Sequence, residues 1–213
     1  MNKTASVERV QRGYTEGVRR LASRSITGLA RTRVTPTMLT ASGVSLCMGA
    51  AALVYFEYRN EWLFFWLGAV VFVVGSLLDI LDGALARAGG KSSAFGAFLD
   101  STTDRIGEAF MLGAIALAFA RDRNETALAF AFAALAGSFL VSYTRSKAES
   151  LGLRGDVGIG SRAERVVVIT AGLVFAPWGG LQWAIYVLAA TAWVTVAQRV
   201  LHVRRQLREQ RQA

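Results

Sequence analysis

Residues 62–88 have the sequence WLFFWLGAVVFVVGSLLDILDGALARA, and residues 94–120 have the sequence AFGAFLDSTTDRIGEAFMLGAIALAFA. Each run is apolar and longer than the roughly 20 residues that a helix needs to cross a bilayer. Each also carries two aspartates: Asp79 and Asp82 lie in the second half of the first run, and Asp100 and Asp104 lie in the first half of the second run. Carboxylates at membrane depth are costly, and by default they indicate function. These two runs predict a helical membrane protein whose functional site lies at the aspartates of these two helices.

Other apolar runs extend this pattern to a whole chain of membrane helices. Hydrophobic residues make up 53% of the 213 residues, and the mean hydropathy of +0.37 exceeds that of an ordinary soluble domain. No linker or repeat divides the chain, so we expect one domain over residues 1–213. The fold class is all-α, an integral membrane protein with six transmembrane helices, of which the fifth is short for a span. The expected helices are 37–57, 62–88, 94–120, 125–149, 164–178 and 181–203.

The ends of the chain are basic. Residues 5–32 place apolar residues at helical spacing among arginines, which predicts a juxtamembrane amphipathic helix on an anionic membrane surface. Residues 204–213 are expected to be a basic cytoplasmic tail. With the N-terminus inside, six spans leave only Arg59, Arg121 and Arg123 of the 24 Lys and Arg outside. The sequence thus predicts a cell (inner) membrane protein with both termini and the aspartates on the cytoplasmic side.

The charge distribution and the cysteine content also limit the binding partners and the covalent cross-links that the chain can have. The net charge of +9 flanks apolar spans, and no aromatic-basic motif accompanies it, which excludes nucleic acid as a partner and favours membrane lipids. The single Cys47 excludes an intrachain disulfide, and its apolar surroundings predict a small core or lipid-facing residue.

The aspartates share helix faces with small residues. Close carboxylates repel unless they are protonated or bridged by cations, and arginines 87 and 105 could neutralise two of the four at most. Oxygen-rich clusters favour Mg²⁺ or Mn²⁺, which share phosphate oxygens with a substrate. On a helix one acidic face holds Asp79, Asp82, Gly83 and Ala86, at i, i+3, i+4 and i+7, and the other holds Gly96, Asp100 and Asp104, at i, i+4 and i+8.

From Asp79 to Asp104 the chain has the pattern D-x2-D-G-x2-A-R-x8-G-x3-D-x3-D. It resembles, at every fixed position, the signature of the CDP-alcohol phosphotransferases. The resemblance implies a homodimer that uses CDP-diacylglycerol, releases CMP and holds two divalent cations, Mg²⁺ or Mn²⁺, for an in-line displacement. It implies that Asp79 and Asp100 bridge both cations, that Asp82 completes one site and Asp104 the other, and that Asp104 is also the catalytic base that takes the acceptor's proton. It places Gly83, Ala86, Arg87 and Gly96 at the nucleotide and diphosphate.

Residues 35–40, TPTMLT, resemble the family's T-P-N-x-L-T segment beside the nucleotide, with Thr37 in place of the usual Asn. The same residues are also an N-cap sequence at the start of a helix. Ser93 lies where related enzymes place a small hydroxyl residue near the diphosphate, and it is equally suited to cap the third helix. The nucleotide contacts expected here are Thr37, Met38, Leu39, Thr40 and Ser93.

Three further segments bear on the acceptor alcohol: residues 142–149, SYTRSKAE, residues 152–156, GLRGD, and residues 162–165, RAER. They are similar to the S-Y-x-K-A-R-A-E, G-L-R-G-D and E-R-x-E-R segments of bacterial phosphatidylinositol-phosphate synthases, which use inositol 1-phosphate. A lysine is usual at 145, and serine replaces the first glutamate at 161. The resemblance implies that the acceptor phosphate is held by Ser142, Arg145, Arg165 and Arg199. The alternative is that these are positive-inside charges on a solvated face.

The sequence therefore predicts an enzyme that transfers a phosphatidyl group from CDP-diacylglycerol to inositol 1-phosphate. Transfer to glycerol 3-phosphate is the alternative within the class, because that acceptor also carries a dianionic phosphate. From other classes, an ion-coupled transporter could hold acids near the midplane, but no inverted repeat or broken-helix pair is visible. A membrane scaffold would not need four acids at fixed spacing.

Overall fold

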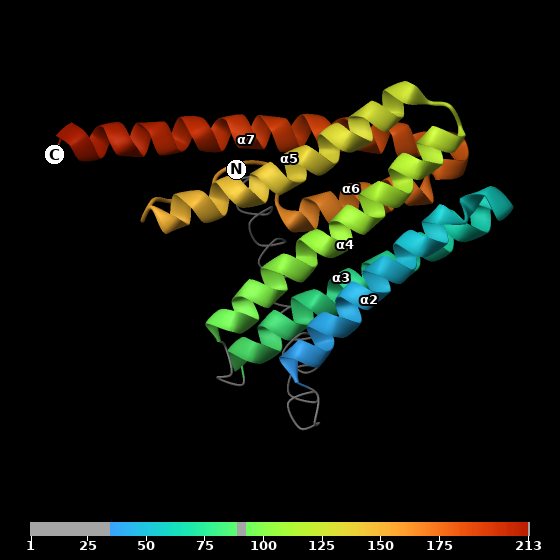
Figure 1. Ribbon diagram of the computed structural model, residues 1–213, viewed down its shortest axis with the longest axis horizontal. Helices are drawn as coiled ribbons and strands as arrows, with labels where there is room; N and C mark the ends of the chain where they lie inside the picture. The colour runs from blue at the N-terminus through green and yellow to red at the C-terminus, as the bar shows by residue number, and fades with distance from the viewer. Residues whose placement is uncertain (1–34, 89–92, 213) are drawn as a thin grey trace, which may run out of the picture.

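The computed structural model describes residues 35–88 and 93–212, and all of the secondary structure in these residues is helical (Figure 1). The predicted all-α class is confirmed. The amphipathic helix expected over residues 5–32 lies outside the described residues. The helices are α2 (Pro36–Tyr55), η1 (Glu57–Arg59), α3 (Glu61–Ala88), α4 (Ala94–Arg121), α5 (Glu125–Ser150), α6 (Arg162–Val174), η2 (Ala176–Trp178) and α7 (Gly180–Gln212).

In the described residues six α-helices lie where six helices were expected, and the largest differences are at the C-terminal ends of the last two. The fifth, α6, stops at Val174 and is followed by the 3₁₀ turn η2, because Pro177 cannot continue the α-helical hydrogen bonds. The last, α7, continues through the residues expected as a tail to Gln212, since no glycine or proline interrupts them after Gly180.

Within the described residues, four helical segments are long and apolar enough to cross a membrane: Thr37–Arg59, Glu61–Asp82, Glu125–Ser150 and Gly180–Gln210. These belong to α2 with η1, α3, α5 and α7. The helix α4 carries several charged residues in its first half, and α6 has only 13 residues, about 20 Å of helix. The chain has the helices of a multi-pass membrane protein, and spanning by all six remains a prediction.

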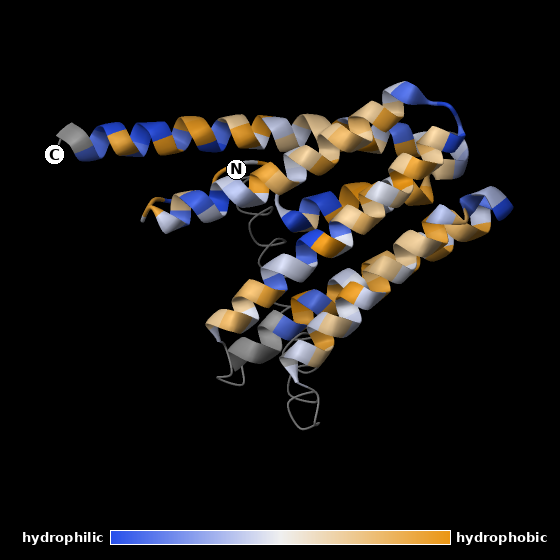
Figure 2. Ribbon diagram, viewed as in Figure 1, coloured by the Kyte–Doolittle hydropathy of each residue, from blue (hydrophilic) through white to orange (hydrophobic). Residues whose placement is uncertain are grey.

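The helices contact one another in a closed ring. In order around it, α2 packs on α3, α3 on α6, α6 on α7, α7 on α5, α5 on α4, and α4 on α2. The core inside this ring is built from buried alanines together with larger side chains, Met111, Ile115, Ile169 and Ile185 among them. Hydrophilic residues interrupt the apolar helices where α3, α4 and the start of α6 converge, and they also occur along the C-terminal half of α7 and at the end of α5 (Figure 2).

Small residues let α2, α3 and α4 approach closely beside that polar region. A Cβ atom on Gly75 would lie 2.9 Å from both the Gly43 carbonyl oxygen and the Cys47 sulfur, and one on Gly107 would lie 3.0 Å from Cys47 Cβ. Cys47 is buried, as predicted for a small core residue. Because Gly75 lies one turn before Asp79, and Gly107 nearly one turn after Asp104, this packing brings the two acidic faces together.

We expect Gly75→Ala to lower the thermal unfolding midpoint of the purified protein in detergent. The added methyl group meets backbone and sulfur atoms at 2.9 Å, and such overpacking costs about 1 to 3 kcal/mol. Gly113→Ala on α4 is the control: nothing lies within 4 Å of its Cβ position, so alanine's higher helix propensity is expected to leave the midpoint unchanged or higher. Equal midpoints for the two variants would contradict this account of the packing.

Candidate active site

Three of the four aspartates form one oxygen cluster between α3 and α4. A carboxylate oxygen from each of Asp79, Asp82 and Asp100 lies within 4.8 Å of the others. Asp79 is 4% exposed and Asp82 is 3% exposed, while Asp100 is half-buried. Three hard oxygen donors at this separation suit a divalent cation such as Mg²⁺ or Mn²⁺, whose bonds to oxygen are about 2.0 to 2.2 Å long. The donor set therefore fits the metal site that the sequence predicted.

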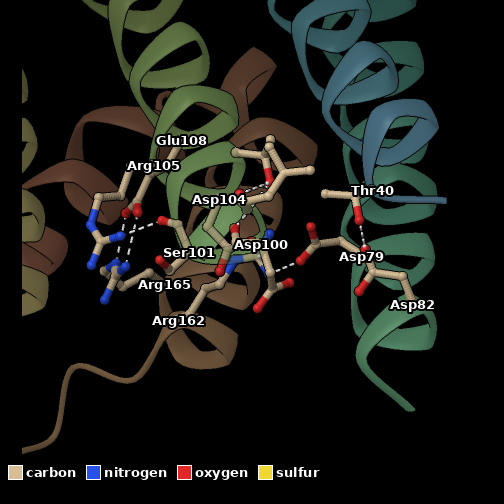
Figure 3. Close-up of polar contacts among 12 residues, drawn as sticks. Thr40, Asp79, Asp82, Asp100, Ser101, Asp104, Arg105, Glu108, Arg162 and Arg165 are labelled. Atoms are coloured by element: carbon tan, nitrogen blue, oxygen red, sulfur yellow. Dashed lines mark hydrogen bonds and ion pairs between the residues drawn. The ribbon is translucent and has the colours of Figure 1, made fainter. Parts of the chain in front are cut away.

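The fourth aspartate is joined to this cluster by an arginine from α6. Arg162 Nη1 lies 2.7 Å from Asp104 Oδ1 and also donates a hydrogen bond to Asp79 Oδ2 (Figure 3). One guanidinium thus links acids of α3 and α4. Arg105, a candidate counter-ion from the sequence, instead donates to the carbonyl of Ser101 in its own helix. Arg162 is a candidate site residue that the sequence analysis did not single out, although it lies in the quoted segment 162–165.

The start of α6 explains why Arg162 is placed there. Ser161 and Glu164 form a capping box: the Ser161 hydroxyl accepts from the Glu164 amide, and Glu164 Oε2 accepts from the Ser161 amide at 2.7 Å. The helix consequently begins at Arg162. The serine that departs from the related E-R-x-E-R pattern therefore has a local role as the N-cap.

At the head of α2 the segment 35–40 has two structural roles. The Thr35 hydroxyl accepts from the Met38 amide at 3.2 Å and so caps the helix. The Thr40 hydroxyl donates to Asp82 Oδ2 and so orients a carboxylate of the cluster. Leu39 and Thr40 are buried, whereas Thr37 and Met38 are exposed.

The expected nucleotide residues lie on the adjoining helix ends. Ser93 caps α4, with its hydroxyl accepting from the Gly96 amide at 3.0 Å, and both residues are exposed. Gly83, Ala86 and Arg87 lie on the last turns of α3, and their side chains are outside the described part of the structure.

A polar cleft of about 540 Å³ opens beside Asp104. Its wall brings together residues of α4, α5, α6, α7 and the segment between α5 and α6. Among them are Asp100 and Asp104 and all four residues expected at the acceptor phosphate: Ser142, Arg145, Arg165 and Arg199.

The three expected arginines of the cleft differ in how their charge is balanced. Arg165, 5% exposed, forms a forked pair with Glu108 (Nε to Oε1 2.6 Å, Nη2 to Oε2 2.8 Å) and donates to the Gly160 carbonyl at 2.9 Å. Arg145 is exposed and pairs with Glu149 at 2.8 Å. Arg199, 6% exposed, donates to the carbonyls of residues 157 and 141, and no carboxylate of the described residues lies within 4.0 Å of it.

An apolar groove of about 650 Å³ lies on the other side of Arg162, between α3 and α6. Arg162 lines both this groove and the polar cleft. The groove and the cleft therefore meet at the guanidinium that bridges the acids. The apolar side chains of the groove include Val73, Leu77, Ile80, Val166, Val167, Val174 and Phe175.

With this geometry the sequence can be placed among known proteins. Residues 33–201 match the CDP-alcohol phosphatidyltransferase family, and the chain belongs to that family. It is therefore a transferase, and the transporter and scaffold alternatives no longer apply.

Two relatives cover most of the chain. An archaetidylinositol phosphate synthase of Pyrococcus horikoshii is 37% identical over 180 residues, covering 84% of this chain and 88% of its own. A phosphatidylinositol phosphate synthase of Mycobacteroides abscessus is 36% identical over 181 residues, covering 83% and 80%.

Solved structures agree with the sequence relatives. The phosphatidylinositol phosphate synthase of Mycobacterium tuberculosis, determined with CDP-DAG bound, has a TM-score of 0.77 and 29% identity, with 86% of this chain and 94% of that chain covered. The same enzyme in complex with manganese and citrate also has a TM-score of 0.77. The sequence and structure comparisons thus agree on the fold and on the family.

We expect Arg162→Gln to raise the affinity of the purified protein for Mn²⁺. Like charges a few Å apart repel by several kcal/mol at an effective dielectric of about 20, so removing this cation is expected to tighten binding at least about tenfold. Titration calorimetry, or electron paramagnetic resonance of free Mn²⁺, measures the change. Arg105→Gln is the matched control, because Arg105 contacts the Ser101 carbonyl. Equal changes in the two variants would contradict direct competition for the acids.

Proposed function

We propose that this protein transfers the phosphatidyl group of CDP-diacylglycerol to inositol 1-phosphate, giving phosphatidylinositol phosphate and CMP. The observation that carries the proposal is the position of Arg162 and the acid cluster where a polar, arginine-walled cleft meets an apolar groove. A lipid donor and a phosphorylated, water-soluble acceptor need this combination. The names of the relatives agree on an inositol phosphate product, and they differ in the lipid part.

The donor fits the groove and the acid cluster together. Its acyl chains would lie against the apolar side chains between α3 and α6, and its diphosphate would reach Arg162 and the acids. When bound, two divalent cations, Mg²⁺ or Mn²⁺, would neutralise the diphosphate and stabilise the developing charge. Asp79, Asp82, Asp100 and Asp104 would hold them. The Thr40 hydroxyl keeps Asp82 in place for this role.

The cytidine is proposed to lie near the ends of α2, α3 and α4, away from the groove. Arginine 87 would give a forked donor to phosphate oxygens, and the small residues would allow close approach of the nucleotide. The residues proposed for this pocket are Thr37, Met38, Leu39, Thr40, Gly83, Ala86, Arg87, Ser93 and Gly96.

The acceptor is proposed to enter the polar cleft, with its phosphate against Arg199, Arg165, Arg145 and Ser142. Arg199 is the strongest of these contacts on physical grounds, because its buried charge is held by carbonyl oxygens and not by a carboxylate. Arg165 keeps N–H groups beyond those used for Glu108 and Gly160. A dianionic phosphate would complete the charge balance of this wall.

Asp104 is proposed as the general base because it lines the cleft that would hold the acceptor. The hydroxyl oxygen of the acceptor would form a bond to the phosphorus that carries the diacylglycerol. The bond from that phosphorus to CMP would break, and the hydroxyl proton would pass to the Asp104 carboxylate. Arg162, whose Nη1 lies 2.7 Å from Asp104 Oδ1, would keep this carboxylate beside the reacting phosphorus.

The setting proposed for this reaction is the cytoplasmic face of the cell membrane, with both termini in the cytoplasm and the protein a homodimer. The apolar helices and the asymmetric distribution of Lys and Arg support the orientation. For α4 and α6 to span as well, they would rely on their neighbours in the helix ring.

The test is an assay of purified protein with CDP-diacylglycerol and each candidate alcohol. We expect CMP and phosphatidylinositol phosphate from inositol 1-phosphate, identified by mass spectrometry, and loss of turnover on chelation. Asp104→Asn is the control for the site and is expected to slow CMP release about 10² to 10⁴-fold while donor binding persists. A preference for glycerol 3-phosphate, which the same arginines would hold, would overturn the acceptor assignment and leave the family chemistry intact.

We further expect Arg199→Gln to raise the KM for inositol 1-phosphate while the KM for CDP-diacylglycerol stays nearly unchanged. A charge-assisted contact contributes about 1.5 to 3 kcal/mol, which corresponds to roughly tenfold to a hundredfold. Arg205→Gln, exposed on the same helix, is the control for loss of positive charge alone. Altered yield with normal kinetics, or efficient use of free inositol by the wild-type protein, would argue against a phosphate-binding role.

A further inference from the structure

The segment between α5 and α6, residues 151–161, is irregular and forms one wall of the polar cleft through Asp156, Gly158, Gly160 and Ser161. An irregular wall positions ligands well only if other elements fix its backbone. The contacts that hold this segment therefore bear on how the acceptor binds.

Three residues on one face of α7 hold the segment along its length. Thr195 Oγ1 accepts from the Gly160 amide at 3.0 Å, and Arg199 Nε donates to the Val157 carbonyl at 2.8 Å. Gln206 makes the third contact. Positions 195, 199 and 206 are four and seven residues apart, so they follow one another along the same helix face.

Gln206 differs from the other two because it makes a pair of hydrogen bonds to one loop residue. The Arg154 amide donates to Gln206 Oε1 at 3.0 Å, and Gln206 Nε2 donates to the Arg154 carbonyl at 2.9 Å. Two bonds fix the orientation of this backbone as well as its position. Gln206 itself does not line the cleft, so it has no contact with the proposed acceptor site.

The backbone carbonyls of this segment in turn orient the guanidinium groups of Arg165 and Arg199. The Gly160 carbonyl accepts from Arg165 Nη1 at 2.9 Å, and the Val157 carbonyl accepts from Arg199 Nε at 2.8 Å. Both guanidinium groups are buried. Space around the segment is tight, since a Cβ on Gly158, where φ is +118°, would lie 2.3 Å from Thr195 Cγ2. A shift of residues 151–161 would therefore move the carbonyls that orient both arginines.

We propose that Gln206 is a positioning residue for the acceptor: through Arg154 it fixes the segment 151–161, whose carbonyls orient Arg165 and Arg199 toward the cleft. The inference rests on the proposed function for the identity of the acceptor. Gln206 lies beyond residue 203, where the sequence predicted the end of this helix. The extension of α7 to Gln212 would thus contribute to acceptor binding. The donor groove, lined by α3 and α6, contains no residue of this segment.

The test compares Gln206→Ala with Gln210→Ala, a matched change one turn further along α7 at an exposed position. Loss of two neutral hydrogen bonds is expected to raise the KM for inositol 1-phosphate roughly fivefold to tenfold in Gln206→Ala. The kcat and the KM for CDP-diacylglycerol are expected to change less than about twofold, because the acid cluster and the groove are untouched. Gln210→Ala is expected to match the wild type.

Hydrogen exchange followed by mass spectrometry supplies a readout that does not depend on turnover. Amides of residues 152–160 are expected to exchange about tenfold faster in Gln206→Ala than in Gln210→Ala, with the helices unchanged. Faster exchange with an unchanged acceptor KM would overturn the proposal, as would a raised KM without faster exchange, or equal rises in both KM values. If the wild type uses another acceptor, the proposed function fails, and the same comparison with that acceptor still decides the role of Gln206.

Discussion

Buried carboxylates in an apolar helix bundle are the constraint on which the rest of this structure depends. Asp79 and Asp82 are almost fully buried, and an uncompensated carboxylate in such a place is costly. Compensation comes from outside α3: Arg162 on α6 pairs with Asp79 and also with Asp104 on α4, and the Thr40 hydroxyl on α2 donates to Asp82. Four helices must therefore converge at one point, and the glycine contacts beside Cys47 allow them to do so.

This convergence also sets the chemistry that the site can support. A phosphatidyl group has its reacting phosphorus between acyl chains that need an apolar surface and a headgroup that needs a polar one. In the structure the apolar groove and the polar cleft meet at Arg162, beside the acids. The proposed function therefore requires charged groups at this depth, although their burial is costly. Only at this boundary would the phosphorus of a lipid donor come within reach of the hydroxyl group of a soluble acceptor.

Much of this arrangement could be predicted from the sequence because it depends on local periodicity. Apolar runs predicted six helices, and the spacing of the aspartates predicted that two acidic faces would meet. The partners of the acids could not be predicted. Arg105 is adjacent to Asp104 in sequence but turns to its own helix, whereas Arg162 comes from a helix far along the chain. Which arginine reaches an acid depends on helix rotation and separation, and residue spacing does not determine these.

The arginines of the cleft illustrate a second limit of sequence reasoning, since equal charges are not equally available to a ligand. Glu108 forms a forked ion pair with Arg165, and Glu149 pairs with Arg145 at the surface. Arg199 is held by carbonyl oxygens, which fix its direction, and no carboxylate of the described residues forms an ion pair with it. Carbonyl groups have no signature in the sequence, so the distinction emerges only from the fold. By this argument the selectivity of the proposed site for a phosphorylated acceptor depends mainly on Arg199 and on the loop backbone that aims it.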